Sequence, residues 1–190
     1  MQDISLHLLD IIENSVRAKA KDITIRVKID RLENRLKIMI KDDGLGMDEE
    51  TLKNSQNPFF TTKNDRVKKV GLGIPLFKQN AELSDGSFTI TSKKNIGTTI
   101  DVDFRLDHID RMPLGNITDT VLTGILGHPE TDFNFTLEMI SNEETKEIFV
   151  FSTKEIKREL EGVPLAHPEV ITFIKNYLNE GITEVYREEI

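Results

Sequence analysis

ITIRVKIDRLENRLKIMIKDDGLG, residues 23–46 of this 190-residue chain, is the stretch that decides the fold. Apolar and polar side chains alternate in residues 23–29 and again in residues 35–41, a pattern typical of half-buried strands. Residues 30–34 between them are a connection of hairpin length. The sequence therefore predicts two neighbouring strands, the second of which leads into the Asp-Asp-Gly-Leu-Gly run of residues 42–46.

Helices and further strands are predicted on both sides of this hairpin. Apolar residues at helical spacing predict a helix over residues 4–19. The elements expected after the hairpin are a helix start at Asp48, a polar and basic loop over 53–70, a helix over 74–83, and strands over 87–92 and 98–106. The run Gly71-Leu72-Gly73 leads into the helix over 74–83, and Ser84-Asp85-Gly86 closes it. Residues 1–106 are therefore expected to form a mixed α+β unit with a mostly antiparallel sheet.

The chain after residue 106 is expected to form a smaller α+β extension. Its predicted elements are a helix near 116–126, strands near 132–140 and 147–152, a helix that opens at the Ser152–Glu155 capping box, and a last helix that starts at Pro168 and ends before Gly181. The predicted fold class is α+β: a two-layer sandwich over residues 1–106 with an extension over residues 107–190.

Charge divides the chain at about the same place. Residues 1–105 contain 18 Lys and Arg against 16 Asp and Glu, whereas residues 106–190 contain 7 against 17. The first part is therefore where a polyanion could bind, and the second repels nucleic acid and anionic membranes. The alternative interpretation is two differently solvated surfaces without a common function.

Composition excludes several classes of protein. The chain has no cysteine, which rules out disulfides, thiolate metal sites and a thiol nucleophile. No basic segment followed by an apolar run marks a secretory signal, and every apolar stretch is far shorter than the roughly 18 residues of a membrane helix. We therefore expect a cytoplasmic protein that binds neither membrane nor nucleic acid.

The predicted first helix carries a polar stripe of Asp10, Asn14 and Arg17, which are separated by four and three residues. Such a stripe presents a carboxylate, a neutral oxygen and a cation together. Because Mg²⁺ keeps several waters and accepts phosphate oxygens, one Asn side chain can suffice as its protein ligand. The competing interpretation is the ordinary polar face of an amphipathic helix.

A second group, Asp42-Asp43-Gly44-Leu45-Gly46, directly follows a strand. The glycines permit a tight turn, and a carboxylate at the end of a strand can accept a hydrogen bond from an exocyclic amine. An ordinary Asp-Gly turn is the alternative. A calcium loop is not supported, because the EF-hand spacing of acids is absent.

Two further segments suit phosphate groups. Residues 57–69 are basic and include Lys63, so they could close over phosphates or form a solvated loop. Gly71-Leu72-Gly73 stands at a helix start, where free N–H groups favour anions. This run is neither a P-loop nor a dinucleotide fingerprint.

The order of these motifs along the chain resembles the GHKL ATPase superfamily, which includes the catalytic domains of histidine kinases, DNA gyrase and MutL. The motifs in chain order are DIIENSVR, KDDGLGMD, NPFFTTK, GLGIPLF and NIGTT. The wording of NPFFTTK and GLGIPLF is most similar to that of histidine-kinase catalytic domains. The resemblance implies a Bergerat fold, in which a sheet is backed by helices on one face and ATP lies beneath a lid.

The resemblance also assigns roles to residues. Those implied to bind ATP are Asn14 (also the Mg²⁺ ligand), Arg17, Asp42, Gly44, Gly46, Lys63, Gly71, Leu72, Gly73 and Thr99. Asp42 would receive the adenine amino group, with Thr99 behind the adenine. Hydrolysing members place a Glu base four residues before the Asn, where this chain has the shorter Asp10. We therefore expect slow hydrolysis, with Asp10 as the candidate catalytic base.

His108 starts the run His-Ile-Asp-Arg-Met-Pro-Leu, whose spacing is similar to the phosphoacceptor motif of histidine kinases. Ile109 replaces the acid that follows the His in that motif, so a structural histidine at a domain junction is the favoured interpretation. The remaining histidines, His7, His128 and His167, are expected to be surface or capping residues.

The resulting hypothesis is an ATP–Mg²⁺-binding regulatory protein that transfers the γ-phosphate to a partner protein. Because 13 residues precede Asn14, we expect no dimerising hairpin with a phosphoacceptor before the domain. The alternatives are an ATP-gated binding switch and a slow ATPase that couples hydrolysis to dimerisation. A homodimer is left open.

Overall fold

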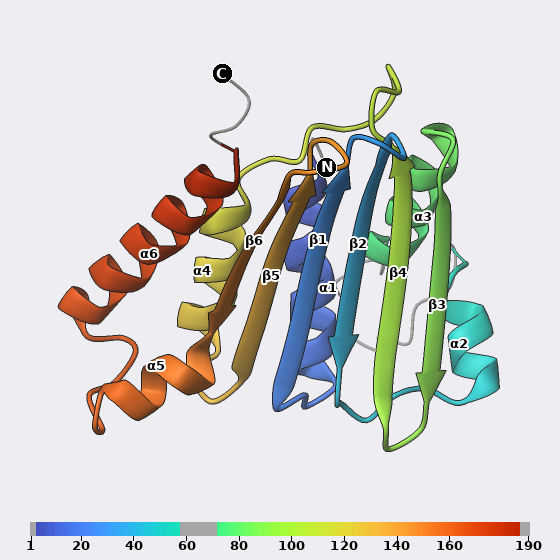
Figure 1. The fold of residues 1–190 in the computed structure, drawn as a ribbon. Helices are drawn as coiled ribbons and strands as arrows, with labels where there is room; N and C mark the ends of the chain where they lie inside the picture. The colour runs from blue at the N-terminus through green and yellow to red at the C-terminus, as the bar shows by residue number, and fades with distance from the viewer. Residues whose placement is uncertain (1–2, 58–71, 187–190) are drawn as a thin grey trace.

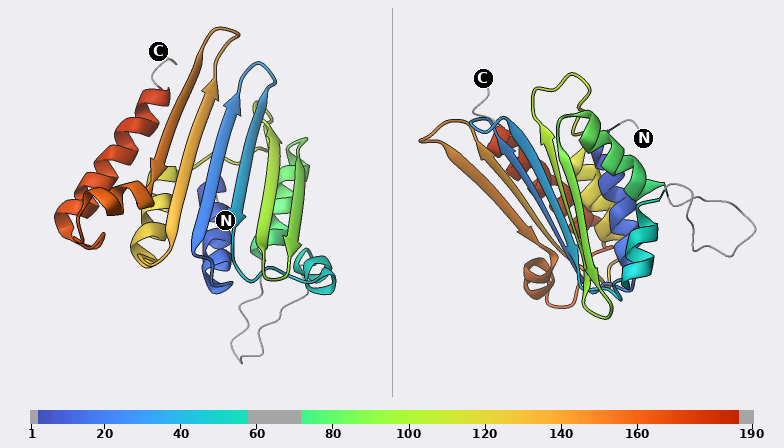
Figure 2. Two further views of the ribbon diagram at one scale, coloured as in Figure 1. Left: turned by 60° about the horizontal axis from the view of Figure 1, so that its bottom comes forward. Right: turned by 90° about the vertical axis from the view of Figure 1, so that its right-hand side faces the viewer.

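A computed structural model describes residues 3–57 and 72–186, which form one twisted six-stranded sheet with helices (Figure 1). The larger helices lie together on one face of the sheet and leave the other face open (Figure 2). The helices are α1 (Ile4–Arg17), α2 (Glu49–Ser55), α3 (Gly73–Leu83), α4 (Ile117–Gly127), α5 (Thr153–Glu159) and α6 (Pro168–Tyr186). The predicted α+β class with two layers is confirmed.

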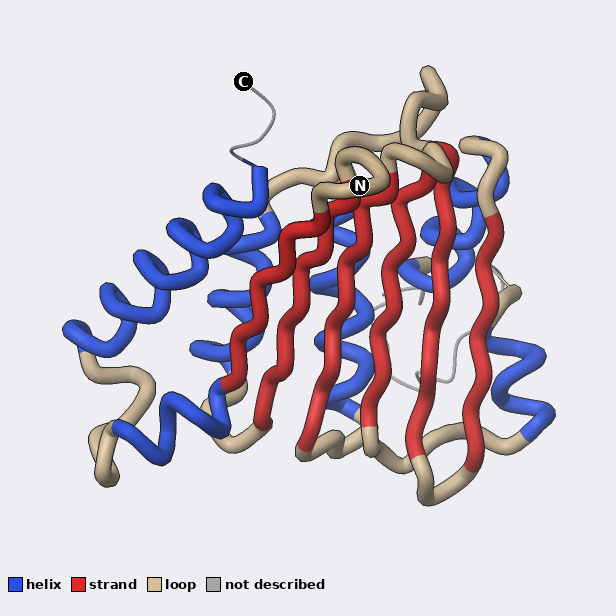
Figure 3. Tube along the Cα trace, in the orientation of Figure 1, coloured by secondary structure: helices blue, strands red, loops and turns tan. Residues whose placement is uncertain are grey.

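The sheet has the strand order β3-β4-β2-β1-β5-β6. The strands are β1 (Asp22–Asp30), β2 (Arg35–Asp42), β3 (Ser87–Lys93), β4 (Gly97–Arg105), β5 (Asp132–Ile140) and β6 (Lys146–Ser152) (Figure 3). All neighbouring strands are antiparallel except β1 and β5, which are parallel. The hairpin predicted from residues 23–46 is thus confirmed as β1 and β2.

The sheet continues without interruption across residue 106. β5 and β6 extend it beyond β1, and α4 packs against α1. The core accordingly contains residues from both parts of the chain, such as Ile25 of β1 and the fully buried Phe133 and Phe135 of β5. The division into residues 1–106 and 107–190 therefore stays a prediction about separate roles.

Alternation along the strands explains the two faces of the sheet. In β1, Ile23, Ile25 and Val27 are buried beneath the helices. The intervening Thr24, Arg26 and Lys28 side chains must point to the opposite, open face, because successive residues of a strand face opposite sides. The helix-covered face therefore supplies the hydrophobic core, and the open face of β1 is polar.

The boundaries of two helices differ from the prediction. α1 ends at Arg17 rather than at residue 19, since Lys19 adopts a positive φ of 62° just after the helix. α6 continues through Gly181 to Tyr186. A Cβ atom at Gly181 would overlap the ring of Phe149, so this glycine permits close packing of α6 on β6 rather than ending the helix.

The predicted capping box at Ser152–Glu155 is wrong in its hydrogen bonds. Ser152 stands at the N-cap of α5 but makes no side-chain capping bond. Its hydroxyl donates instead to Oδ1 of Asn134 on β5, at 2.9 Å. Among the described residues, no helix is long and apolar enough to span a membrane.

Candidate functional site

The carboxylate of Asp42 lies at the end of β2, where it is buried and accepts three hydrogen bonds. The residue is only 7% exposed. Its Oδ1 accepts from the backbone N–H groups of Gly44, at 2.9 Å, and Thr98, at 3.3 Å, and its Oδ2 accepts from the hydroxyl of Ser15, at 2.8 Å. A carboxylate has about four acceptor positions. One position on Oδ2 therefore remains for a further donor.

The turn after Asp42 requires its glycines. Gly46 has a φ of +60°, and a Cβ atom there would overlap the carbonyl of Lys93. A Cβ atom at Gly44 would lie 2.8 Å from the carbonyl oxygen of Ala18, the residue that caps α1. The turn also donates from the N–H of Leu45 to that same Ala18 oxygen, at 2.8 Å. The turn over residues 43–46 therefore packs closely against the C-terminal end of α1.

The structure brings Thr98, rather than Thr99, to this cluster. Thr98 is the register partner of Asp42, whereas Thr99 is the partner of Lys41 and lies on the other face of the sheet. The prediction that Thr99 lines the site thus disagrees with the strand register. Sequence reasoning also missed Ser15, although a polar residue one turn after Ile11, on the apolar face of the predicted helix, was available as a signal.

Asn14 and Arg17 lie together on α1, as predicted. The Arg17 guanidinium donates from Nη2 to Oδ1 of Asn14, at 2.6 Å, and from Nε to the carbonyl of Glu13, at 3.1 Å. Asn14 is half-buried and Arg17 is exposed. The side-chain oxygen of Asn14 is therefore already used as an acceptor, and a cation that binds it must compete with Arg17.

Asp10, one turn earlier on α1, lies against the start of α3. A Cβ atom at Gly73 would overlap Oδ2 of Asp10, so a glycine is needed at this close approach. α3 has no side-chain cap at Leu72, and Pro75 has no N–H to offer. The first N–H groups of a helix have no partner within the helix, and such groups favour an anion. Lys63 and Gly71 lie outside the described residues.

His7 is buried, so the prediction that it is a surface or capping residue is wrong. Its ring stacks on Phe77 of α3 with centroids 4.9 Å apart, and its Nε2 lies 2.7 Å from Nδ2 of Asn80. The Nδ1 atom has no hydrogen-bond partner in the described structure. Burial lowers the pKa of His7 to about 4. His7 therefore joins α1 to α3, and its place between the buried Ile4 and Ile11 was the overlooked signal.

His108 lies at the other end of the sheet from Asp42. Asp42 pairs with Thr98 near the start of β4, whereas His108 follows the end of this strand at Arg105. Seven residues of strand span about 24 Å. The Nε2 atom of His108 lies 3.5 Å from Oδ2 of Asp85. The structure therefore does not bring His108 to the Asp42 site of the same chain.

The described residues fit a magnesium ion only if a bound phosphate group supplies some of its oxygen ligands. In the described part of the chain, no group of three or more His, Cys, Asp or Glu side chains could hold a metal. A half-buried Asn14 oxygen beside a helix start suited to anions fits an ion that takes most of its ligands from phosphate and water. The described residues therefore fit such an ion only if a phosphate group binds with it.

The sheet with helices on one face and a polar cluster at the ends of β2 and α1 define a nucleotide-binding domain of the ATPase class. Residues 2–108 match the family described as histidine kinase-, DNA gyrase B-, and HSP90-like ATPase. The chain belongs to this family. The predicted GHKL assignment and Bergerat fold are thereby confirmed, with an ATP-binding domain of the histidine-kinase type.

Two relatives are kinases of Bacillus subtilis (strain 168). The chain is 32% identical to sensor histidine kinase YvrG over 100 residues, which cover 52% of this chain and 17% of that protein. It is 31% identical to sporulation kinase C over 94 residues, which cover 50% and 21%. The chain thus matches about a fifth of the length of these relatives.

A solved structure of similar fold is the MutL ATPase domain of Aquifex aeolicus complexed with ADP. It has a TM-score of 0.48 and 16% sequence identity, and the match covers 77% of this chain and 63% of that one.

Proposed function

We propose that the chain binds ATP with Mg²⁺ at the Asp42 site and transfers the γ-phosphate to a partner protein. The observation that carries the proposal is the buried Asp42 carboxylate with one open acceptor position. The exocyclic amine of adenine would fill that position with one N–H. Guanine presents a carbonyl oxygen there, and two acceptors facing each other would repel. The site should therefore select adenine nucleotides.

The phosphates would lie between α1 and the start of α3. Arg17 is the cation proposed to contact them: its partner Asn14 lies one turn from Asp10, whose carboxylate lies against Gly73. Bound Mg²⁺ would neutralise phosphate charge, with Asn14 as its protein ligand. Arg17 would then leave the Asn14 oxygen and pair with a phosphate. Lys63, Gly71 and Leu72 complete the proposed phosphate contacts.

Asp10 supports a second candidate function, slow ATP hydrolysis. Its carboxylate lies at the start of α3, where phosphates are expected, so it could orient a water or the hydroxyl of an acceptor. Since positioning and charge neutralisation do most of the work in phosphoryl transfer, a short acid at this place is compatible with transfer. We keep the ATP site within residues 1–106 and assign a different role to residues 107–190.

Incubation with γ-labelled ATP and Mg²⁺ tests these functions. Protein-bound label in the presence of an acceptor would support transfer, whereas free phosphate that falls in Asp10→Asn would support hydrolysis. Nucleotide bound without turnover would support an ATP-gated switch. Asn14→Ala should abolish Mg²⁺-dependent binding, and Asn179→Ala on the exposed side of α6 is the matched control. Absence of ATP binding by the wild-type protein would overturn the proposal.

A further inference from the structure

Helix α6 carries a continuous stripe of exposed residues beside the residues that it buries in the core. The helix buries Val170, Ile174, Leu178 and Val185. On the neighbouring side, the exposed residues are separated by four, four, three and four positions, which places them in one stripe. This outer stripe consists of Glu169, Phe173, Tyr177, Glu180 and Glu184.

The centre of the outer stripe is a pair of stacked aromatic rings. Phe173 is 54% exposed and Tyr177 is 42% exposed, with ring centroids 5.9 Å apart and planes 4° from parallel. Tyr177 also contacts Phe149 and Phe151 of the edge strand β6, at 5.5 and 6.2 Å. The rings are therefore held by the core while their outer faces stay exposed. Rigid aromatic side chains of this kind lose little conformational freedom when a partner binds.

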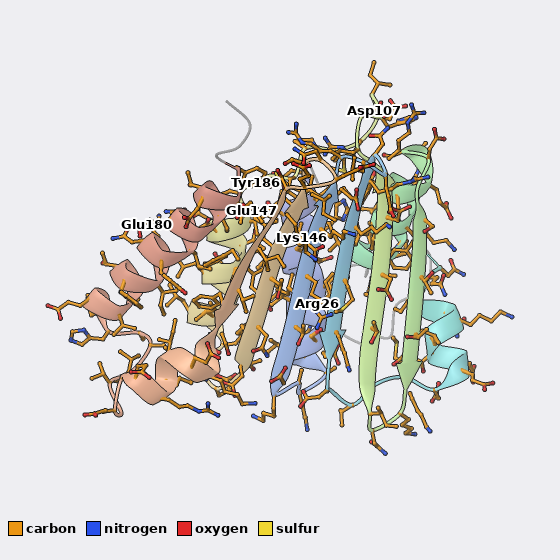
Figure 4. The ribbon with its side chains drawn as sticks, in the orientation of Figure 1. Arg26, Asp107, Lys146, Glu147, Glu180 and Tyr186 are labelled. Atoms are coloured by element: carbon orange, nitrogen blue, oxygen red, sulfur yellow. The ribbon has the colours of Figure 1, made fainter. Side chains whose placement is uncertain are left out.

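The charges of the outer stripe are all negative. Within the described residues, Glu169, Glu180 and Glu184 form no ion pair, and Figure 4 shows Glu180 on the side of α6 turned away from the strands. The helix's one described cation, Lys175, lies on another side and pairs with Asp119 at 3.6 Å. Residues 106–190 as a whole contain 17 acids against 7 bases. The field around the stripe therefore attracts cations.

We propose that the outer stripe of α6 is a docking surface for an Arg- and Lys-rich segment of another protein. A guanidinium group would stack on the exposed faces of Phe173 and Tyr177, where ring electrons attract a cation. Neighbouring cations of the segment would pair with the glutamates at either end of the stripe. Nucleic acid and anionic lipid are repelled by the same charges. The surface lies on the far side of β5 and β6 from Asp42, so it stands independently of the ATP site.

The two tyrosines of the chain, with no tryptophan, provide a direct measurement. The full chain labelled with fluorotyrosine should give two ¹⁹F signals, Tyr177 within the stripe and Tyr186 at the end of α6 as the reference, assigned with Tyr177→Phe. Titration with an octa-arginine peptide should shift the Tyr177 signal saturably and leave the Tyr186 signal in place. Added salt should weaken the binding.

Substitutions separate the stripe from general attraction to an acidic protein. Glu180→Gln with Glu184→Gln should weaken binding about fivefold, because two exposed ion pairs are lost. The matched control is Glu49→Gln with Glu50→Gln, two exposed acids of α2 at the opposite edge of the sheet, which should bind as the wild type does. Phe173→Ser should also weaken binding of the peptide, since it removes one of the two rings on which a guanidinium group would stack.

Three results would overturn the proposal. The first is a Tyr177 signal that does not shift saturably with the peptide. The second is equal weakening by the α2 control, which would mean unspecific charge attraction. The third is a Tyr177 shift that grows with protein concentration alone, which would assign the stripe to a second copy of the chain. Nucleotide binding should be unchanged in all stripe variants, so failure here leaves the ATP proposal untouched.

Discussion

The two ends of β4 show charged groups in opposite situations. At the Thr98 end, the Asp42 carboxylate is buried, held by three donors, and left with one open acceptor position. At the Arg105 end, Arg105 pairs with Asp107 at 2.8 Å and Asp85 at 3.6 Å on an exposed surface. The first arrangement is prepared for a ligand, while the second is satisfied by its own ion pairs and by water. Burial with an unused acceptor, rather than charge alone, distinguishes the candidate site.

Asp42→Asn should have the largest effect on ATP affinity of the substitutions at the two ends of β4. The amide would turn N–H donors toward Ser15 or toward the adenine amine, where the carboxylate accepted, so we expect ATP affinity to fall by about 100-fold. Isothermal titration with ATP and GTP measures the change, and thermal unfolding checks that the variant is folded. Equal affinity for ATP and GTP in the wild type would show that Asp42 does not read adenine.

The buried His7 and the exposed His167 extend the comparison to histidines. Burial holds the pKa of His7 at about 4, below the usual 6.5, although the carboxylates of Asp10 and Asp3 act in the opposite sense. The unfolded chain therefore takes up this proton first as the pH falls. The contribution of the neutral, buried His7 to the free energy of unfolding is complete above pH 6.5. It should decline by up to about 3 kcal/mol by pH 4.

Denaturant unfolding at several pH values measures this decline. His7→Gln should flatten the slope of stability between pH 6.5 and 4, and His167→Gln, an exposed histidine, should leave it unchanged. The same slope in wild type and His7→Gln would mean that His7 takes up its proton over the same pH range in the folded and the unfolded chain.

Ser15→Ala should have a smaller effect than Asp42→Asn. The Asp42 carboxylate loses one buried donor but keeps the two N–H groups on Oδ1, so ATP affinity should fall about tenfold. Ser152→Ala removes a comparable hydroxyl bond, to Asn134 on β5, and should not change ATP affinity. If Ser15→Ala binds ATP as tightly as the wild type, the hydroxyl does not position Asp42 for the nucleotide.

His108→Asn should have the smallest effect. The half-buried imidazole lies 3.5 Å from the exposed Asp85 carboxylate, and its Nδ1 accepts from the N–H of Asp110 at 3.2 Å. The side-chain oxygen of Asn can also accept from that N–H, so stability should change by less than about 0.5 kcal/mol and ATP affinity should stay the same. Chemical unfolding and nucleotide titration test both statements. Acid-labile label that disappears in this variant would make His108 a phosphoacceptor and would remove the contrast between the two ends of β4.

Much of the fold was predictable because its signals are local. The alternation of Ile23, Ile25 and Val27 with polar neighbours is contained within five residues, and it correctly predicted β1. Helix ends were less predictable: Gly181 is locally a helix-ending signal, but it lies inside α6, where the missing Cβ atom leaves room for the Phe149 ring. The placement of β5 parallel to β1 was also beyond the sequence, because periodicity does not say which strands become neighbours.

For the candidate site, the sequence by itself determined the family, through the order of five short motifs. It also determined which types of side chain each motif supplies. Tertiary structure alone decided which side chains meet. Ser15 reaches Asp42 across 27 residues and Thr98 reaches it across 56, whereas Thr99 faces the open side of the sheet. The alternation of Ile100, Val102 and Phe104 places Thr98 on the covered face of β4 and Thr99 on the open face. Only the pairing of β4 with β2 brings Thr98 opposite Asp42, because a local pattern does not say which strands become neighbours.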